Sequence, residues 1–221
     1  MLDGLGGRLI VSCQPVPGGP MDRPDIVAAL ALAALAGGAA GLRIEGVANL
    51  AAVRAATRAP IVGLVKRDLG DSPVRITPHL GDVDALVEAG ADIVAVDATD
   101  RPRPAATAAL IGRVRARGRL AMADCATAAE GEAARDAGAA LLGSTLSGYT
   151  GGPVPDEPDF GLVAELARLG AFTVAEGRFH RPEQAARARR LGADAVVVGS
   201  AITRPEHVTG WFARALEGGH G

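Results

Sequence analysis

The sequence contains one lysine among its 23 basic residues, since every other basic side chain is arginine. Arginine keeps its proton at neutral pH, whereas lysine can lose its proton when its surroundings lower its pKa. Apart from the chain terminus, Lys66 is therefore the one amine that could act as a base. The alternative interpretation is an arginine-rich composition that leaves one surface lysine by chance.

Aromatic residues are also scarce, at 3% of 221 residues, and the formal net charge is only −2. Proteins that bind nucleic acids by stacking need aromatic side chains, and most nucleic-acid-binding domains are strongly basic. We therefore expect no nucleic-acid partner. Hydrophobic residues at 48% and charged residues at 22% are typical of one globular domain.

Two cysteines, Cys13 and Cys125, provide neither a disulfide framework nor a four-thiolate zinc site. The four histidines show no ligand spacing, so we expect no metal. The longest uncharged apolar run, residues 26–42, is interrupted by glycines and is shorter than the roughly 20 residues of a membrane helix. The first residues lack the layout of a cleavable signal. These absences predict a cytoplasmic protein with no membrane partner.

Short β-branched runs alternate with stretches rich in alanine, leucine and arginine. The expected strands are residues 8–14, 41–44, 61–65, 92–97, 120–123, 139–143, 172–175 and 195–198. The expected helices are residues 25–36, 47–56, 82–88, 105–117, 128–136, 160–169, 182–191 and 205–216. This alternation predicts parallel strands joined by crossover helices. We expect Trp211 and Phe212 to anchor the last helix to the sheet.

A repeat supports this count of elements. Glycines 38, 90, 138 and 192 each follow a predicted helix and precede a predicted strand, where glycine suits a left-handed helix C-terminus. Each interval between them holds about two strand–helix units, which predicts an α/β fold of the (β/α)8 TIM-barrel type in a single domain, residues 1–221. An open doubly wound sheet is the alternative, but residues 13–20 lack its G-x-G-x-x-G fingerprint.

Active sites of such barrels lie at the carboxyl ends of the strands. Polar groups follow the predicted strands at Gln14, Arg43 with Glu45, Lys66, Asp97, Asp124, Ser144 with Thr145, and Glu176. Charges inside a barrel rim are costly unless they are paired or used. We interpret Asp97 as structural and Asp124 as a substrate contact.

The loops after the last two strands have the composition of a phosphate site. Gly177 and Arg178 follow the seventh strand, and Gly199, Ser200 and Arg204 follow the eighth. Small residues let backbone N–H groups approach an anion, and barrels often bind phosphate between these loops. Ordinary glycine turns with solvated arginines are the alternative.

Several motifs together resemble the N-acylglucosamine-6-phosphate 2-epimerase (N-acetylmannosamine-6-phosphate 2-epimerase) family. They are LIVSCQ (9–14), GLRIEG (41–46), GLVKRD (63–68), DIVAVDATDRPRP (92–104), MADCAT (122–127), GSTLSGYT (143–150), VAEGR (174–178) and VVVGSAITRP (196–205). The resemblance extends from about residue 9 to residue 212. It implies a cofactor-independent isomerase of sialic acid and amino sugar catabolism, acting on a phosphorylated N-acylamino sugar.

The resemblance also implies roles for individual residues. Lys66 corresponds to the family's proton acceptor and donor, and Glu176 to its catalytic partner. Substrate-binding positions correspond to Gln14, Arg43, Asp124 and Arg204, and the phosphate site to Gly177, Arg178, Gly199 and Ser200. The sequence does not set the oligomeric state, and a homodimer is one arrangement that it allows.

Two other functions fit the same residues. A Schiff-base aldolase or lyase would use Lys66 to attack a carbonyl carbon. A non-catalytic barrel that binds sugar phosphates would keep the anion site without any proton transfer. A trapped covalent adduct on Lys66 would favour the lyase, and an absence of turnover would favour the binding protein.

Overall fold

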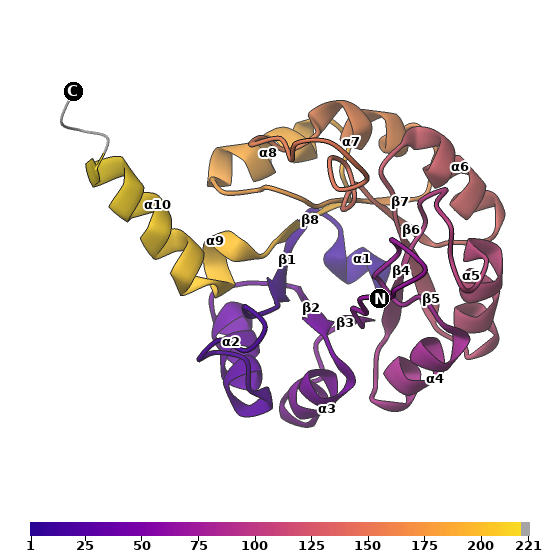
Figure 1. Cartoon of the computed structure of the whole chain (residues 1–221), viewed down its shortest axis with the longest axis horizontal. Helices are drawn as coiled ribbons and strands as arrows, with labels where there is room; N and C mark the ends of the chain where they lie inside the picture. The colour runs from indigo at the N-terminus through magenta and orange to yellow at the C-terminus, as the bar shows by residue number, and fades with distance from the viewer. Residues whose placement is uncertain (218–221) are drawn as a thin grey trace.

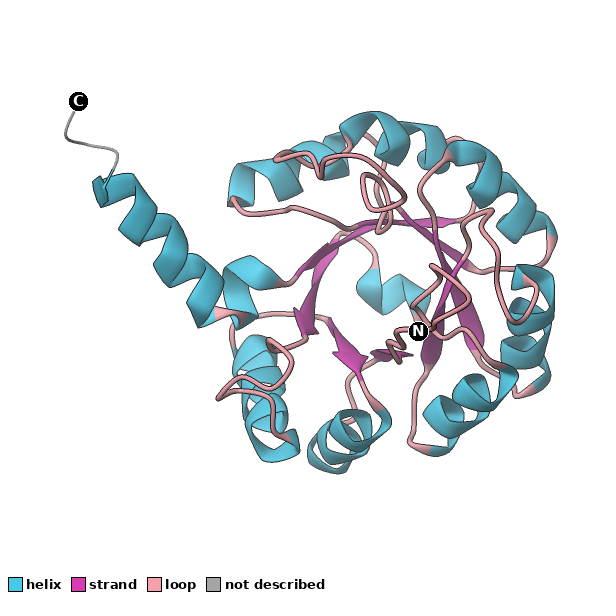
Figure 2. Cartoon of the chain, in the orientation of Figure 1, coloured by secondary structure: helices cyan, strands magenta, loops and turns pink. Residues whose placement is uncertain are grey.

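Eight parallel strands close into a barrel in the computed structural model, which describes residues 1–217 (Figures 1 and 2). The strands are β1 (Arg8–Cys13), β2 (Gly41–Glu45), β3 (Ile61–Leu64), β4 (Ile93–Asp97), β5 (Leu120–Asp124), β6 (Leu141–Gly143), β7 (Phe172–Ala175) and β8 (Ala195–Val198). Each strand pairs with the next along the chain, and β8 pairs with β1. The predicted (β/α)8 barrel is confirmed, and its strand ends differ from the predicted ones by at most two residues.

Helices surround the barrel and connect its strands. They are α2 (Pro24–Ala36), α3 (Val47–Ala56), α4 (Leu80–Glu88), α5 (Thr107–Ala116), α6 (Ala128–Asp136), α7 (Phe160–Ala167), α8 (Pro182–Arg190), α9 (Ser200–Thr203) and α10 (Pro205–Glu217). Two helices lie outside the predicted ranges, because α1 (Leu2–Leu5) and α9 have four residues each and are too short to show a period. Leu5 of α1 is buried against Ile10 and Val62 inside the barrel, so α1 closes its amino-terminal end. Within residues 1–217, no helix is both long and apolar enough to cross a membrane.

The strands are buried on both faces, which explains their continuous apolar runs. Along β4, alternate side chains enter two different clusters: Ile93 and Ala95 point into the barrel, whereas Val94 and Val96 pack beneath the helices. The four glycines of the repeat, at 38, 90, 138 and 192, all have φ between 97° and 103°. The predicted left-handed helix ends are therefore confirmed.

Helix α10 departs from the predicted packing. It projects away from the barrel (Figure 1), and none of its residues is buried. Trp211 contacts the ring of His180 at 4.6 Å between centroids, but Phe212 is 70% exposed, so the predicted anchoring by Phe212 is wrong. The cause lies in Pro205, which cannot continue α9 and forces an extended conformation on Arg204, with ψ at 83°. The helix axis changes direction at this point.

The close packing of β3 yields a prediction about stability. A Cβ atom at Gly63 would lie 2.5 Å from Leu50 Cδ1 and 3.0 Å from Ala91 Cβ, both in the core. We expect Gly63→Ala to lower the free energy of unfolding by about 1–3 kcal/mol through overpacking. Gly112→Ala is the matched control, because Gly112 lies within α5 with no atom near its Cβ position. Urea denaturation of both variants checks this, and equal stability would contradict it.

Candidate active site

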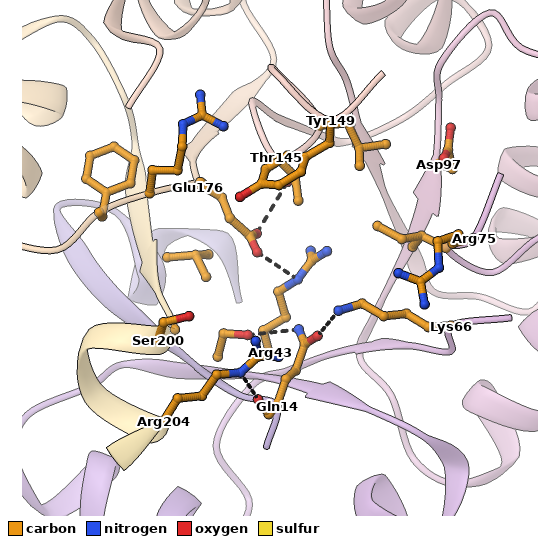
Figure 3. A pocket seen from close by; sticks show the side chains of 18 of the residues that line it. Gln14, Arg43, Lys66, Arg75, Asp97, Thr145, Tyr149, Glu176, Ser200 and Arg204 are labelled. Atoms are coloured by element: carbon orange, nitrogen blue, oxygen red, sulfur yellow. Dashed lines mark hydrogen bonds and ion pairs between the residues drawn. The ribbon is translucent and has the colours of Figure 1, made fainter. Parts of the chain in front are cut away.

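A pocket of about 390 Å³ opens at the carboxyl ends of the strands (Figure 3). The predicted site residues that line it are Gln14, Arg43, Lys66, Glu176, Gly177, Arg178, Gly199, Ser200 and Arg204. Asp124 does not line the pocket, because it is completely buried against Arg43. The barrel therefore brings these predicted residues together from the ends of five strands, β1, β2, β3, β7 and β8, that are far apart in sequence.

The guanidinium group of Arg43 occupies the floor of the site and is 1% exposed. Its Nη2 atom lies 2.6 Å from Asp124 Oδ2, and its Nη1 atom donates to Asp124 Oδ1 at 3.3 Å. Its Nε atom lies 3.2 Å from Glu176 Oε1. One buried positive charge is thus shared by two carboxyl groups, and loss of either partner would alter the charge state of the other.

The loop after β6 holds Glu176 in two ways. Ser144 Oγ donates to the Glu176 carbonyl oxygen at 2.9 Å and accepts from the Glu176 backbone N–H at 3.1 Å. Thr145 Oγ1 lies 2.7 Å from Asp124 Oδ1 and 3.3 Å from Glu176 Oε2. Ser144 therefore fixes the main chain of Glu176, whereas Thr145 contacts its side chain.

The Glu176 carboxyl group favours its protonated form more than an ordinary glutamate does. Burial raises its pKa to about 7, and the nearby negative charge of Asp124 acts in the same direction against the opposing effects of Arg43 and Lys66. Its side chain is only 13% exposed. A carboxyl group with this pKa can both give and take a proton near neutral pH.

Lys66 lies two residues after the end of β3 and reaches the pocket from the side opposite to Glu176 (Figure 3). Its backbone N–H donates to Glu45 Oε1 at 3.2 Å, and its Nζ donates to Gln14 Oε1 at 2.7 Å. Gln14 Nε2 in turn donates to Ser12 Oγ at 2.8 Å. Because Lys66 donates to the amide oxygen, the ammonium form is bound by a neutral group and not by a direct carboxylate partner.

The surroundings of Lys66 lower its pKa. Loss of solvation is the largest cause, followed by the positive charges of Arg43 and Arg204, while Glu45 and Glu176 oppose the shift. The Lys66 residue is nevertheless exposed at the pocket mouth, so solvent weakens the effect of burial on its pKa. The amine is therefore accessible to a ligand and more often neutral than an ordinary lysine at the same pH.

The expected phosphate loops meet at one end of the pocket. Gly177 and Arg178 both have positive φ, at 108° and 61°, and such strain in a non-glycine residue clusters at functional sites. The Arg178 side chain donates to the carbonyl oxygens of Ser147 and Glu157 and so binds the loop between β6 and α7. Arg204 Nε donates to the Gln14 carbonyl oxygen at 2.7 Å. Both arginines thus also hold the loops in place.

Other candidate residues have structural positions. Asp97 accepts from Arg101, Arg103 and Thr99, which suits a structural role, and it also lines the pocket. Cys13 and Cys125 are buried, and burial raises the pKa of Cys13 to about 12 and that of Cys125 further still. These thiols therefore stay protonated and are poor nucleophiles. Among residues 1–217, no three side chains of His, Cys, Asp or Glu group as metal ligands do; His220 lies outside that range.

Sequence reasoning did not single out several residues at the site. Arg75, Ile76 and Tyr149 line the pocket from long loops, in which no period or motif indicates the direction of a side chain. Thr145 was noted at a strand end but given no role. Its place at the site could have been predicted from the sequence, because a hydroxyl within two residues of the carboxyl end of a barrel strand lies at the active face.

Together, the fold and the site define a (β/α)8 barrel with a lysine and a glutamic acid facing one pocket and a glycine-rich loop pair beside them. The comparisons with known proteins agree. The family model described as "Putative N-acetylmannosamine-6-phosphate epimerase" matches residues 27–218, and the chain belongs to this family.

Individual relatives support the assignment. The chain is 63% identical over 214 residues to the "Bifunctional enzyme NanE/NanK" of Brucella melitensis, which covers 96% of this chain and 41% of that protein. It is 58% identical to a "Putative N-acetylmannosamine-6-phosphate 2-epimerase" of Actinobacillus pleuropneumoniae, over 98% of this chain and 95% of that protein. The chain thus spans less than half the length of the bifunctional relatives and nearly all of the others.

A solved structure provides the same comparison in three dimensions. The N-acetylmannosamine-6-phosphate 2-epimerase from Clostridium perfringens superposes with a TM-score of 0.94 at 39% identity, covering 97% of this chain and 96% of that one. Thiamine phosphate pyrophosphorylase from Pyrococcus furiosus, at 17% identity and a TM-score of 0.63, shares the fold alone.

The lowered pKa of Lys66 can be tested by chemical labelling, because Lys66 is the only lysine of the chain. Acetylation by acetic anhydride needs the neutral amine, and Lys66 is the only side chain that offers one. We expect the pH of half-maximal labelling, followed by mass spectrometry, to be lower in the folded protein than in urea, because folding lowers the Lys66 pKa. Equal midpoints would show that the pocket does not perturb the amine.

Proposed function

We propose that the protein interconverts N-acetylmannosamine 6-phosphate and N-acetylglucosamine 6-phosphate by inversion at C2, a step of sialic acid and amino sugar catabolism. Membership of the epimerase family supports this activity. The single observation that carries the proposal is the placement of the only lysine, with a lowered pKa, in one pocket with Glu176.

The chemistry requires removal and return of one proton. In the open-chain sugar, C2 lies next to the C1 aldehyde, so loss of the C2 proton leaves an enolate that the aldehyde oxygen stabilises. Return of a proton to the opposite face inverts C2. The reaction needs a base, groups that open the ring and a group that stabilises the oxyanion, and it transfers no electrons to a cofactor.

Lys66 acts as the base in this proposal, since its lowered pKa increases the fraction of neutral amine near pH 7. Gln14 orients the amine through its 2.7 Å hydrogen bond. Glu176, with a pKa of about 7, moves protons at the sugar oxygens during ring opening or supplies the second proton. Arg43 provides positive charge at the pocket floor for the developing enolate.

The phosphate group would bind at the other end of the pocket, between the loops after β7 and β8. Backbone N–H groups near Gly177, Gly199 and Ser200 and the positive charge of Arg204 suit an anion. Arg178 supports this end by holding the neighbouring loop. Asp124 contributes through Arg43, because it is buried beneath that side chain.

We propose that the protein works in the cytoplasm on this small molecule and on no nucleic acid or membrane. The free and buried Cys13 and Cys125 suit a reducing compartment. The net charge of −2 and the scarcity of aromatic residues are unfavourable for binding nucleic acid.

The activity is tested by NMR in D2O. We expect N-acetylmannosamine 6-phosphate to gain deuterium at C2 as it converts to the gluco epimer, because the base exchanges its proton with solvent. Lys66→Met and Lys66→Arg should each lose at least about 10²-fold in kcat/KM, since neither variant has a side chain that can act as a neutral amine. Circular dichroism checks that both remain folded.

Two results would favour the alternative functions, a lyase or a non-catalytic binding protein. Borohydride added during turnover reduces a Schiff base, so a stable sugar adduct on Lys66 would indicate a lyase. Binding of both sugar phosphates without interconversion would indicate a non-catalytic barrel. Retention of full turnover by Lys66→Arg would remove Lys66 from the role of base.

We also propose that the chain forms a homodimer in which α10 contacts the second copy. Val208, Phe212 and Leu216 follow one another at four-residue intervals, so they share one face of α10. Phe212 and Leu216 are 70% and 75% exposed, and α10 buries no residue within its own chain. An apolar face of this kind favours association.

Light scattering coupled to size-exclusion chromatography tests the dimer. We expect the wild-type mass to be twice 22.2 kDa and the double variant Phe212→Asp with Leu216→Asp to be monomeric, because charges would replace the apolar contact. Thr209→Asp is the matched control, since Thr209 is an exposed polar residue of the same helix. A monomeric wild-type protein would contradict the proposal.

A further inference from the structure

Four side chains at the floor of the pocket form a closed ring of contacts. Arg43 contacts Asp124 and Glu176, and Thr145 joins these two carboxyl groups on their other side. The four residues come from β2, the ends of β5 and β6, and the residue after β7. Thr145 is the only neutral member of the ring. Loss of its hydroxyl would open the ring while leaving both carboxyl groups beside Arg43.

We propose that Thr145 is a positioning residue that holds the Glu176 carboxyl group in the orientation and charge state used for proton transfer. This inference rests on the proposed epimerase function and adds to it a residue outside the expected catalytic and binding set. It predicts an effect on chemistry rather than on substrate binding.

The geometry supports a role in orientation. Each oxygen of the Glu176 carboxyl group has its own contact: Oε1 forms an ion pair with Arg43 Nε at 3.2 Å without hydrogen-bond geometry, and Oε2 accepts from Thr145 Oγ1 at 3.3 Å. The terminal torsion of glutamate is otherwise broad, so two contacts define the carboxyl plane where one would not. Because proton transfer depends on alignment of donor and acceptor, rotation of this plane would slow the reaction.

The main chain of Glu176 is held without Thr145. Ser144 Oγ binds both the N–H and the carbonyl oxygen of Glu176, and Ser144 is buried. A change at Thr145 therefore leaves the backbone support intact. Ser144 holds the main chain of Glu176, and Thr145 contacts its side chain. The effect of Thr145 on the Glu176 carboxyl group can therefore be measured separately.

The charges of the ring give Thr145 a second effect. Two carboxyl groups face one guanidinium, with Lys66 as the next positive charge, so full ionisation leaves the ring negative. The Thr145 hydroxyl has one proton, which is shared between Asp124 Oδ1 at 2.7 Å and Glu176 Oε2 at 3.3 Å. The hydrogen bond to Glu176 favours the ionised carboxylate and lowers the Glu176 pKa. Thr145 thus opposes the influence of burial and of Asp124, and loss of the hydroxyl should raise the Glu176 pKa.

The experiment compares Thr145→Val, which removes the hydroxyl, with Thr145→Ser, which keeps it. We expect Thr145→Val to lower kcat about tenfold, as for loss of a hydrogen bond to a charged group, with a smaller change in KM. The apparent pKa near 7 in its pH–rate profile should move to higher pH. Thr145→Ser should retain most of the activity and the wild-type profile. The pair Thr145→Ala and Thr145→Ser serves the same comparison if valine prevents folding.

Thr173→Val is the matched control for loss of a buried hydroxyl. Thr173 lies within β7, the strand that precedes Glu176, and its hydroxyl donates to the Ala171 carbonyl oxygen at 3.2 Å. We expect this variant to keep the wild-type kcat and pH profile. A similar loss in both valine variants would indicate general damage to the barrel and overturn the positioning role.

A second measurement is independent of turnover. Glu176 is protonated at pH 5 and ionised at pH 8, so the free energy of unfolding of Thr145→Val should fall relative to Thr145→Ser as pH rises between these values. A difference that stays constant with pH would overturn the proposed effect on charge. If wild-type protein does not epimerise the sugar but the pH-dependent difference appears, the proposed function fails and the coupling of Thr145 to Glu176 stands.

Discussion

The structure of the site depends on one buried guanidinium group. Arg43 is enclosed at the floor of the pocket, and arginine cannot avoid its charge there by releasing a proton. Asp124 supplies a bidentate partner that is equally buried. A buried charge without a partner would cost several kcal/mol, so this pair is a condition for placing Arg43 in the barrel interior.

Burial is the largest cause of the pKa shifts of both proposed catalytic residues, and the same guanidinium group is the next largest influence on each of them. Its positive charge lowers the pKa of Lys66, and it lies directly against Glu176, whose pKa would otherwise be raised even further by burial and Asp124. The Lys66 pKa moves down and the Glu176 pKa moves up, so both approach the neutral range. In that range a neutral Lys66 can accept a proton and a protonated Glu176 can donate one. Neither shift needs a direct contact between Lys66 and Glu176.

The sequence predicted the fold well because a (β/α)8 barrel is built from repeated local signals. Runs such as residues 93–97 show burial on both faces, and glycine at position 90 indicates the preceding helix end. The site could be predicted as a set of strand ends, because closure of the barrel brings all of them to one rim. Because the barrel is closed, residues that are far apart in the sequence but lie at strand ends come close together in space.

What could not be predicted depends on contacts across the barrel or beyond it. Asp124 and Glu45 both lie at strand ends, and the sequence does not show which of them contacts Arg43. The three-dimensional register places Asp124 beneath Arg43, whereas Glu45 accepts from the Lys66 backbone N–H. Thr145 acquires its position from two carboxyl groups on different strands. The direction of α10 depends on a local bend at Pro205 that a helical period does not record.

The composition of the chain gains a physical meaning from this arrangement. The positive charges that lower the Lys66 pKa belong to Arg43 and Arg204, which retain their protons at any pH at which the protein is folded. Lysines in their places could share the proton loss, and the neutral amine would then be distributed over several positions. A site with one lysine among arginines confines the titratable amine to Lys66.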